Sequence, residues 1–426
     1  MNKNFLALGL AAALLAPQVA GAEGFAINEW SAEGVAMGGA RMFAEDDAAN
    51  VAYNPASITK VKGEVMKSSY TYLSPHGNYK LYDSNNDEIK GEPTHNKVHA
   101  GWAVGTYYVR QINDKEWFGI GAFPRFAMVS EFERNSKAST NAFFSKLNGV
   151  SVTPTYAHKF DKKWSAAVGA EINYVGLELQ KNLVIPTAGV NGTTQIEGES
   201  YALGWNAAAN YAFDDKNEIG VVYRSRIKHS LEADLKGYRT KSPASPLGGS
   251  NDVFGNAYGV VTLPDSWDIG YNHKFDKKTR LELKATRTNW STYDALNVYF
   301  DKSLIGIPGK VESSPSAKNW SDGWRYAIGL EHNFSDKYAV MAGFAFDESS
   351  IPHDGGDFMV PTGLRRTYSI GARYNDKKQT VAVALGWMDV GTLDFAGHPE
   401  KGDAYSSAHA YDSFTKIASI SYQRKF

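Results

Sequence analysis

The chain contains no cysteine, no long hydrophobic run beyond its first residues and no excess of charge of either sign. The absence of cysteine excludes disulfide frameworks, thiolate metal sites and cysteine nucleophiles. Because 45 Lys and Arg balance 46 Asp and Glu, the basic surface that nucleic-acid binding requires is missing. The mean hydropathy of −0.39, with no later stretch near the ~20 apolar residues of a membrane-spanning helix, excludes a helical membrane protein.

The first 22 residues have the pattern of a secretory signal peptide. Lys3 supplies the positive charge, residues 5–16 are apolar, and residues 20–22 form a small-residue cleavage site. A membrane anchor is the alternative, but an apolar run of about 12 residues is too short to cross a bilayer as a helix. We therefore expect export, with a mature chain that starts at Glu23.

The main structural signal is a strict alternation of side-chain character over segments of about ten residues. From Tyr201 to Phe213 the odd positions are mostly aromatic or aliphatic, whereas the even positions are Ala, Gly and Asn. The segment Trp324 to Phe334 repeats the pattern, and helical periodicity fits neither. Alternation of this kind is typical of a β-strand that separates lipid from a wet lumen, and abundant aromatic residues (24 Tyr, 21 Phe, 10 Trp) fit the girdles of such a barrel.

Charged residues fix which face of each strand meets lipid, since a charge on the lipid side at the midplane costs ~2–4 kcal/mol. In the segment after residue 217 this reasoning predicts that Ile219, Val221, Tyr223 and Ile227 face lipid. The same phase directs Arg224, Arg226 and Lys228 into the barrel interior.

Short polar turns alternate with longer connections, as in outer-membrane barrels. The turns are rich in Asp, Asn and Lys and occupy residues 113–115, 161–163, 214–216, 276–278, 335–337 and 375–377. The longer connections are residues 77–96, 236–256, 301–319, 348–364 and 397–411. We predict an all-β membrane protein, a barrel of about 14 antiparallel transmembrane strands over residues 63–426. Phe426 ends an alternating strand similar to the signal that the barrel assembly machinery reads, although Arg424 departs from it.

Residues 23–62 lack alternation, are rich in Gly and are expected to be compact and partly helical. A 14-stranded barrel encloses a lumen too wide for strand side chains to fill. We therefore predict that residues 23–62 form an N-terminal hatch inside the lumen; a soluble periplasmic extension is the alternative.

This segment carries a family resemblance. Gly24-Phe25, Asn28-Glu29, Gly38-Gly39-Ala40, Asp46-Asp47 and especially Asn54-Pro55-Ala56 resemble the hatch of the long-chain fatty acid transporter FadL and of its TodX-type relatives for aromatic hydrocarbons. Further matches follow in order along the chain, at residues 204–207, 223–225, 263–267, 324–325 and 345–347 together with Pro352. The resemblance covers nearly the whole mature chain. It implies a monomeric outer-membrane barrel, not an enzyme, that takes up hydrophobic compounds passively from the lipopolysaccharide-covered outside.

The resemblance also implies roles for individual residues. Phe25, next to Gly24, is expected to fill a ligand pocket in the lumen, with ordinary hatch packing as the alternative. Asn54, Pro55 and Ala56 are expected to brace the hatch against the wall, because Pro55 fixes φ and Asn54 can cap through its side chain.

In the family an inward kink of the third strand opens a lateral exit. The matching segment here contains Pro124, which cannot donate a ladder hydrogen bond and independently predicts a break. Phe123, Pro124 and Arg125 are therefore expected to border the exit.

The sequence indicates the transported compound less clearly than it indicates the fold. Long-chain fatty acids are the first expectation, but the connection 181–198 is shorter than the family's external loop, so aromatic hydrocarbons or other small hydrophobic ligands are the alternative. Arg224, Arg226 and Arg325 are candidates to meet a carboxylate, although pairing with lumen acids such as Glu331 or Glu232 is the preferred interpretation.

Two other classes of function fit the sequence less well. A barrel hydrolase could use His353, His398 or His409 on external loops, but no nucleophile spacing accompanies them. A general porin would not need a Gly-rich plug. No metal cluster, phosphate loop or nucleotide fingerprint is present, so we expect no metal and no cofactor.

Overall fold

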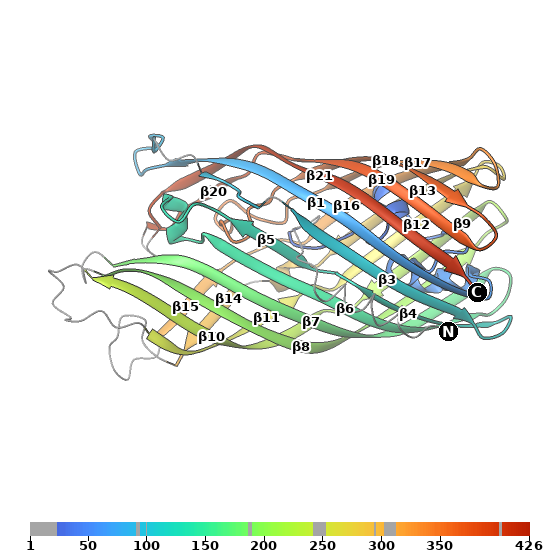
Figure 1. Cartoon of the computed structure of the whole chain (residues 1–426), viewed down its shortest axis with the longest axis horizontal. Helices are drawn as coiled ribbons and strands as arrows, with labels where there is room; N and C mark the ends of the chain where they lie inside the picture. The colour runs from blue at the N-terminus through green and yellow to red at the C-terminus, as the bar shows by residue number, and fades with distance from the viewer. Residues whose placement is uncertain are drawn as a thin grey trace.

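The computed structural model is a closed 14-stranded antiparallel β-barrel (Figure 1). It describes residues 24–90, 94–98, 100–185, 190–241, 253–293, 295–301, 312–399 and 403–426. The expected signal peptide, residues 1–22, lies outside them. The last strand pairs with the first from Val65 opposite Lys425 to Tyr82 opposite Ser407, which closes the wall.

Several wall strands are continuous and several consist of two segments separated by a break. The continuous strands are β1 (Glu64–Tyr82), β3 (Gly101–Gln111), β6 (Phe144–Lys159), β7 (Trp164–Ile185), β8 (Val190–Ala212), β17 (Tyr338–Asp347), β18 (Arg365–Asn375), β19 (Gln379–Val390) and β21 (Ser407–Lys425). The interrupted strands are β4 (Glu116–Phe123) with β5 (Ala127–Glu131), β9 (Asn217–Arg224) with β10 (Ile227–Lys241), β11 (Val253–Leu263) with β12 (Ser266–Lys274), β13 (Thr279–Thr288) with β14 (Ala295–Phe300), and β15 (Glu312–Ala317) with β16 (Gly323–Asn333). Short pieces at the loop end are β2 (Thr94–His95), β20 (Asp394–Ala396) and the 3-10 helix η2 (Lys137–Thr140).

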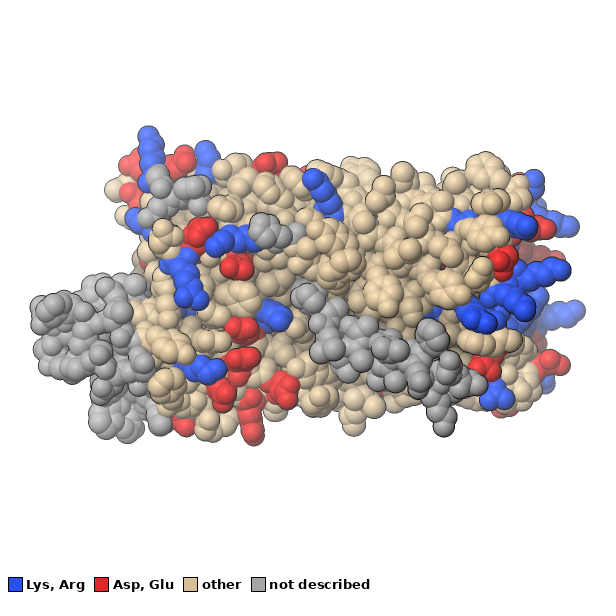
Figure 2. Space-filling view, viewed as in Figure 1, with Lys and Arg blue, Asp and Glu red and all other residues tan. Residues whose placement is uncertain are grey.

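The alternation predicted from the sequence is present in the wall. On β8, Tyr201 and Leu203 are 70% and 77% exposed on the outside, whereas Asn206 and Asn210 are buried on the inside. Figure 2 shows a largely uncharged band between two ends at which charged side chains gather. Within the described residues, no helix has the length and apolar character needed to cross a membrane.

One predicted register is wrong. Arg224 points inward as expected, but Ile227 is 1% exposed and Arg226 and Lys228 lie outside. Asn206 of β8 pairs with Arg224, and Glu199 of β8 pairs with Glu232. The two β8 residues are seven positions apart, whereas their partners are eight positions apart. The extra residue forms a bulge at the break between β9 and β10, and a slip of one residue moves all following side chains to the opposite face.

Tight turns close the barrel at the end where the C-terminus lies (Figure 1). The Asp161 carboxylate accepts hydrogen bonds from the backbone N–H groups of Lys163 (2.7 Å) and Trp164 (2.8 Å), and Asp276 caps its turn in the same way. The hydrogen bond from the Trp164 N–H, which has the largest effect, and the one from Lys163 hold the pKa of Asp161 below its ordinary value. Each turn thus satisfies its own backbone donors.

Residues 24–62 lie inside the barrel and are almost entirely buried. They contain the helices α2 (Ala32–Ala36) and α3 (Asn50–Tyr53) and the 3-10 helix η1 (Pro55–Lys60). Helix α2 packs against β17, β18, β19 and β21, and η1 packs against β4, β6, β7 and β8. We refer to this segment as the hatch; its limits of 23 and 62, and those of the signal peptide and barrel, stay predictions.

Candidate functional site

The side chain of Phe25 is enclosed by aromatic rings. Its ring centroid lies 4.7 Å from that of Trp290, 5.3 Å from Tyr293, and 5.9 Å from both Phe126 and Trp320, mostly in edge-to-face geometry. Phe25 is 1% exposed. We call the enclosure formed by the four rings around Phe25 the Phe25 pocket. The Phe25 side chain thus occupies an aromatic enclosure inside the barrel, and its role in a ligand pocket stays a prediction.

Breaks in neighbouring wall strands place the pocket rings in the lumen. Trp290 and Tyr293 come from the break between β13 and β14, where the 3-10 helix η4 (Trp290–Thr292) forms. Trp320 comes from the break between β15 and β16. The sequence reasoning missed all three, and the loss of alternation at these two points is the signal that could have found them.

A third break lies in the third wall strand, at the position where the sequence predicts a kink; we call this break the kink. Strand β4 ends at Phe123, β5 begins at Ala127, and the ladder between β4 and β3 ends at Ala122 opposite Thr106. Pro124 lies in the break and has no N–H to donate.

The start of the hatch pairs with the kinked strand. Ile27 donates its backbone N–H to the Arg125 carbonyl (2.8 Å), and Ala127 donates to the Phe25 carbonyl (2.9 Å). Ala26 and Phe126 form an antiparallel bridge. The residues that fill the pocket and the residues that pair with the kink are thus the same short piece of chain.

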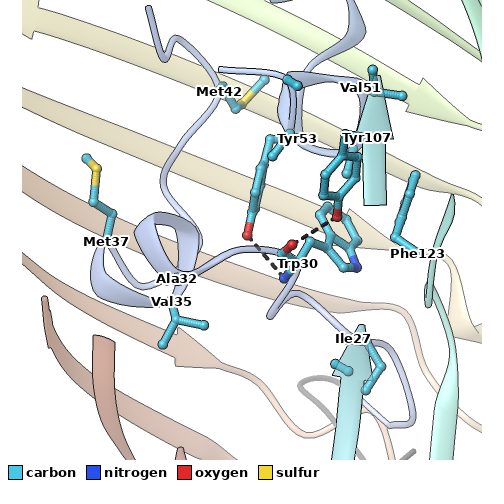
Figure 3. Close-up of a cluster of buried hydrophobic side chains, with 14 of the residues drawn as sticks. Ile27, Trp30, Ala32, Val35, Met37, Met42, Val51, Tyr53, Tyr107 and Phe123 are labelled. Atoms are coloured by element: carbon cyan, nitrogen blue, oxygen red, sulfur yellow. Dashed lines mark hydrogen bonds between the residues drawn. The ribbon is translucent and has the colours of Figure 1, made fainter. Parts of the chain in front are cut away.

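Trp30 packs the hatch against the kink (Figure 3). Its indole N–H donates to the Pro124 carbonyl at 2.5 Å, and its ring lies 5.3 Å from that of Phe123. Its backbone carbonyl accepts a hydrogen bond from the Tyr107 hydroxyl (2.9 Å), and its backbone N–H donates to the Tyr53 hydroxyl (3.2 Å). Trp30 is therefore a positioning residue that the sequence analysis did not single out.

Arg125 turns into the barrel rather than lying open at the kink. Its guanidinium donates to Glu171 of β7 at 2.7 Å, and both side chains are buried. Ser151 donates to the other carboxylate oxygen of Glu171 at 2.6 Å. The charge of Arg125 is thus neutralised within the wall.

The expected brace, Asn54-Pro55-Ala56, joins the hatch to β8. The Asn54 side-chain oxygen accepts from the Ala56 N–H (3.1 Å) and caps η1, while Pro55 occupies the first turn of η1. The Asn54 side-chain nitrogen donates to Asn210 of the wall at 2.7 Å, and Asn210 donates to Ser57 at 3.0 Å.

The three candidate arginines are engaged by acids. Arg224 pairs with Asp268 (2.8 Å) and donates to the Ala52 carbonyl of the hatch. Arg325 pairs with Asp347 (2.6 Å) and donates to the Gly38 carbonyl at 3.0 Å. Arg226 is largely exposed and lies 3.1 Å from Asp265. The first two hold the hatch, and the acids involved differ from Glu331 and Glu232.

A buried network of charges fixes the hatch to the wall, and the sequence analysis did not identify it. Lys67 of β1 donates to Glu33 (2.7 Å) and Asp47 (2.9 Å) of the hatch. Arg41 of the hatch pairs with Asp47 (3.0 Å) and with Glu331 of β16 (3.2 Å). Buried charges are tolerated only when paired in this way.

The external histidines form local loop contacts. His353 and His409 both contact Asp394. The His353 ring nitrogen lies 2.9 Å from the backbone carbonyl of Asp394, and the His409 ring nitrogen contacts the Asp394 carboxylate. Among the residues that the structure describes, no group of three or more His, Cys, Asp or Glu is placed to hold a metal ion.

Known proteins are similar to this chain over nearly its full length. Residues 13–423 match the family model described as outer membrane protein transport protein (OMPP1/FadL/TodX). The long-chain fatty acid transport protein of Escherichia coli strain K12 is 23% identical, over 90% of this chain and 91% of its own length. Outer membrane protein P1 of Haemophilus influenzae is also 23% identical, over 88% of this chain and 86% of its own length.

Two solved structures share the fold. A Pseudomonas aeruginosa FadL homologue superposes with a TM-score of 0.83 at 18% identity and covers 95% of this chain and all of its own. The Pseudomonas putida toluene transporter TodX superposes with a TM-score of 0.72 at 16% identity, again over 95% of this chain and all of its own.

Proposed function

The chain belongs to the OMPP1/FadL/TodX family of outer membrane transport proteins, and we propose that it takes up long-chain fatty acids. The family consists of transport proteins, and its members act on hydrophobic compounds at the outer membrane. In this proposal the ligand is captured outside, held in the lumen where Phe25 lies, and released sideways at Phe123, Pro124 and Arg125. Transport needs no cofactor and no energy source.

The observation that carries the proposal is the continuity between pocket and kink. Phe25 fills the pocket through its side chain and pairs with Ala127 through its carbonyl. A ligand that takes the place of the Phe25 ring must move this residue, and the bonds to the kinked strand move with it. Ligand entry at the pocket is thereby coupled to rearrangement of the wall at the exit.

The protein is proposed to work as a monomer surrounded by outer-membrane lipid and lipopolysaccharide, after insertion by the barrel assembly machinery. Pairing of β1 with β21 supports the monomer, because neither the first nor the last wall strand is left with an open edge that a second copy must cover.

Uptake of aromatic hydrocarbons is the second candidate. The rings around Phe25 favour it, since aromatic groups contact one another edge to face. The external end of the wall supports it too: the β7–β8 ladder continues to Ile185 opposite Val190, so that most of the connection 181–198 is hairpin rather than loop.

Uptake into cells that lack the gene tests the proposal and separates the two cargoes. Labelled oleate and labelled toluene are supplied to cells expressing the wild-type protein, the Phe25→Ala variant, or the matched control Phe334→Ala at an exposed phenylalanine next to β16. Oleate uptake that depends on the protein supports the proposal, and dependence of toluene uptake alone supports the second candidate. Uptake of neither, or a large open-channel conductance in planar bilayers despite the hatch, contradicts both.

A further inference from the structure

Two indole groups of the Phe25 pocket carry buried hydrogen-bond donors. The indole N–H groups of Trp290 and Trp320 are buried, and neither meets a partner among the residues that the structure describes. Their rings lie 5.1 Å apart. Native proteins leave few buried donors unpaired, because each was hydrogen bonded to water before folding. Two such donors on neighbouring rings of one pocket point to a ligand that supplies the acceptor.

The present occupant shows which shape the pocket accepts. The Phe25 side chain is a single benzene ring on one methylene group, and its neighbours contact it mostly edge to face. A planar ring of this size reproduces those contacts, whereas an alkyl chain does not. The Phe25 side chain has no oxygen or nitrogen that could accept from the two indole groups, and its carbonyl accepts from Ala127 instead.

The charges near the pocket argue against an ionised ligand. Lys318 lies close to Tyr293, but its ammonium group is buried against the Asp357 carboxylate. The Arg125 guanidinium, 5.1 Å from the Phe126 ring, is paired with Glu171, and Arg365 donates to the Gly24 carbonyl and to Thr362. A carboxylate in the pocket would have to take one of these cations from its present partners, which is costly in a buried site. Neutral acceptors such as a ketone, ester or ether oxygen avoid that cost.

We propose that the Phe25 pocket selects neutral compounds made of one small aromatic ring with an oxygen acceptor, which Trp290 and Trp320 bind by hydrogen bonds. This inference rests on the proposed function, in that a hydrophobic compound enters the lumen and displaces Phe25. It differs from that proposal in the substrate, because neither a fatty acid nor toluene satisfies both the rings and the indole donors.

Binding of four matched probes to the full mature protein in detergent tests the selection. Acetophenone has both the ring and the acceptor, isopropylbenzene only the ring, cyclohexyl methyl ketone only the acceptor, and isopropylcyclohexane neither. Equilibrium dialysis is performed on the Phe25→Ala variant, in which the internal competitor is removed, with empty micelles as the reference. We expect acetophenone to bind about tenfold more tightly than any other probe.

Two conservative variants then assign the donors. In the Phe25→Ala background, Trp290→Phe and Trp320→Phe keep an aromatic ring but remove the N–H. Each is expected to reduce the preference for acetophenone over isopropylbenzene by roughly threefold to tenfold, the value of one neutral hydrogen bond. Trp205→Phe, on the lipid-facing side of β8, is the matched control and leaves the preference unchanged.

The outcomes separate this inference from the proposed function. Equal binding of all four probes, or an acetophenone preference that survives both tryptophan substitutions, overturns the inference. If oleate binds and is taken up while acetophenone shows no advantage, the inference fails and the transporter proposal stands. If no hydrophobic probe binds and none is taken up, the proposed function fails as well.

Discussion

Replacing Lys67 by methionine should release the hatch without disrupting the wall. The Lys67 ammonium is 1% exposed and is the shared partner of Glu33 and Asp47. Methionine keeps most of the side-chain volume but leaves two buried carboxylates with less positive charge. Removal of one member of a buried ion pair costs ~3–5 kcal/mol. At 1.4 kcal/mol per factor of ten, the population with a displaced hatch should rise roughly 10²-fold to 10⁴-fold.

Single-channel recording in planar bilayers measures this population directly, because a displaced hatch leaves a water-filled lumen. Wild-type protein should be closed almost all the time, whereas Lys67→Met should open in long-lived steps. Lys416→Met, at an exposed position of β21, is the matched control and should stay closed. Glu33→Gln combined with Lys67→Met should restore part of the closure, since Glu33 is hydrogen bonded to Lys67 and its charge is removed with that of its partner. A Lys67→Met protein as closed as the wild type would show that the network does not hold the hatch.

Further predictions concern the kink, the brace, the packing and the pH dependence of the hatch. Pro124→Ala supplies an N–H that can extend the ladder toward β3, so uptake of the cargo should fall severalfold while binding is retained; unchanged uptake would count against a lateral exit at this break. Asn54→Ala removes a cap, worth ~1 kcal/mol, together with the bond to the wall, and should raise the open-channel probability at least fivefold. Gly343→Ala places a Cβ 2.2 Å from the backbone nitrogen of Gly38, so the hatch cannot seat and the channel should be open; a closed channel would show that the wall yields instead. Burial alone would raise the pKa of Asp47, but the charges of its cationic partners outweigh burial and hold the pKa below its ordinary value. Its stabilising effect is therefore present above the pKa of the unfolded chain and is lost as the pH falls, so closure should be constant from pH 8 to 5 and should weaken only below roughly pH 4.

The sequence predicts those features of the fold for which lipid or water restricts the side chain at every second position of a strand. The outward row Tyr201 to Phe213 could be predicted, because a polar side chain in lipid is costly at any position along it. The change of phase at Ser225 could not, since one extra residue leaves composition and local pattern almost unchanged. The structure shows this change of phase because β8 pairs with both β9 and β10, and its pairing leaves one residue of the neighbouring strand without a partner.

The site was only partly predictable for a related reason. Phe25 and Pro124 could be singled out, one through the family resemblance and the other because proline is incompatible with a continuous ladder. Trp290 and Trp320 look like girdle residues in a chain so rich in aromatics, and only the breaks in their strands turn them inward. In the sequence, Lys67 is indistinguishable from any other charged residue that faces the lumen. Its partners Glu33 and Asp47 lie 34 and 20 residues earlier, in a segment whose irregular pattern does not indicate which side chains meet the wall.

The bonds between the hatch and the final strand set an order for biogenesis. Ser421 accepts a hydrogen bond from the Ala32 N–H (2.8 Å), and Gln423 accepts from Ala48 (3.1 Å) and donates to the carbonyl of Asp46 (2.8 Å). The hatch, which lies at the N-terminal end of the described residues, is thus held in part by residues of the strand β21. A nascent or truncated chain without its C-terminal strand cannot complete the seal, so permeability control comes only with the finished protein.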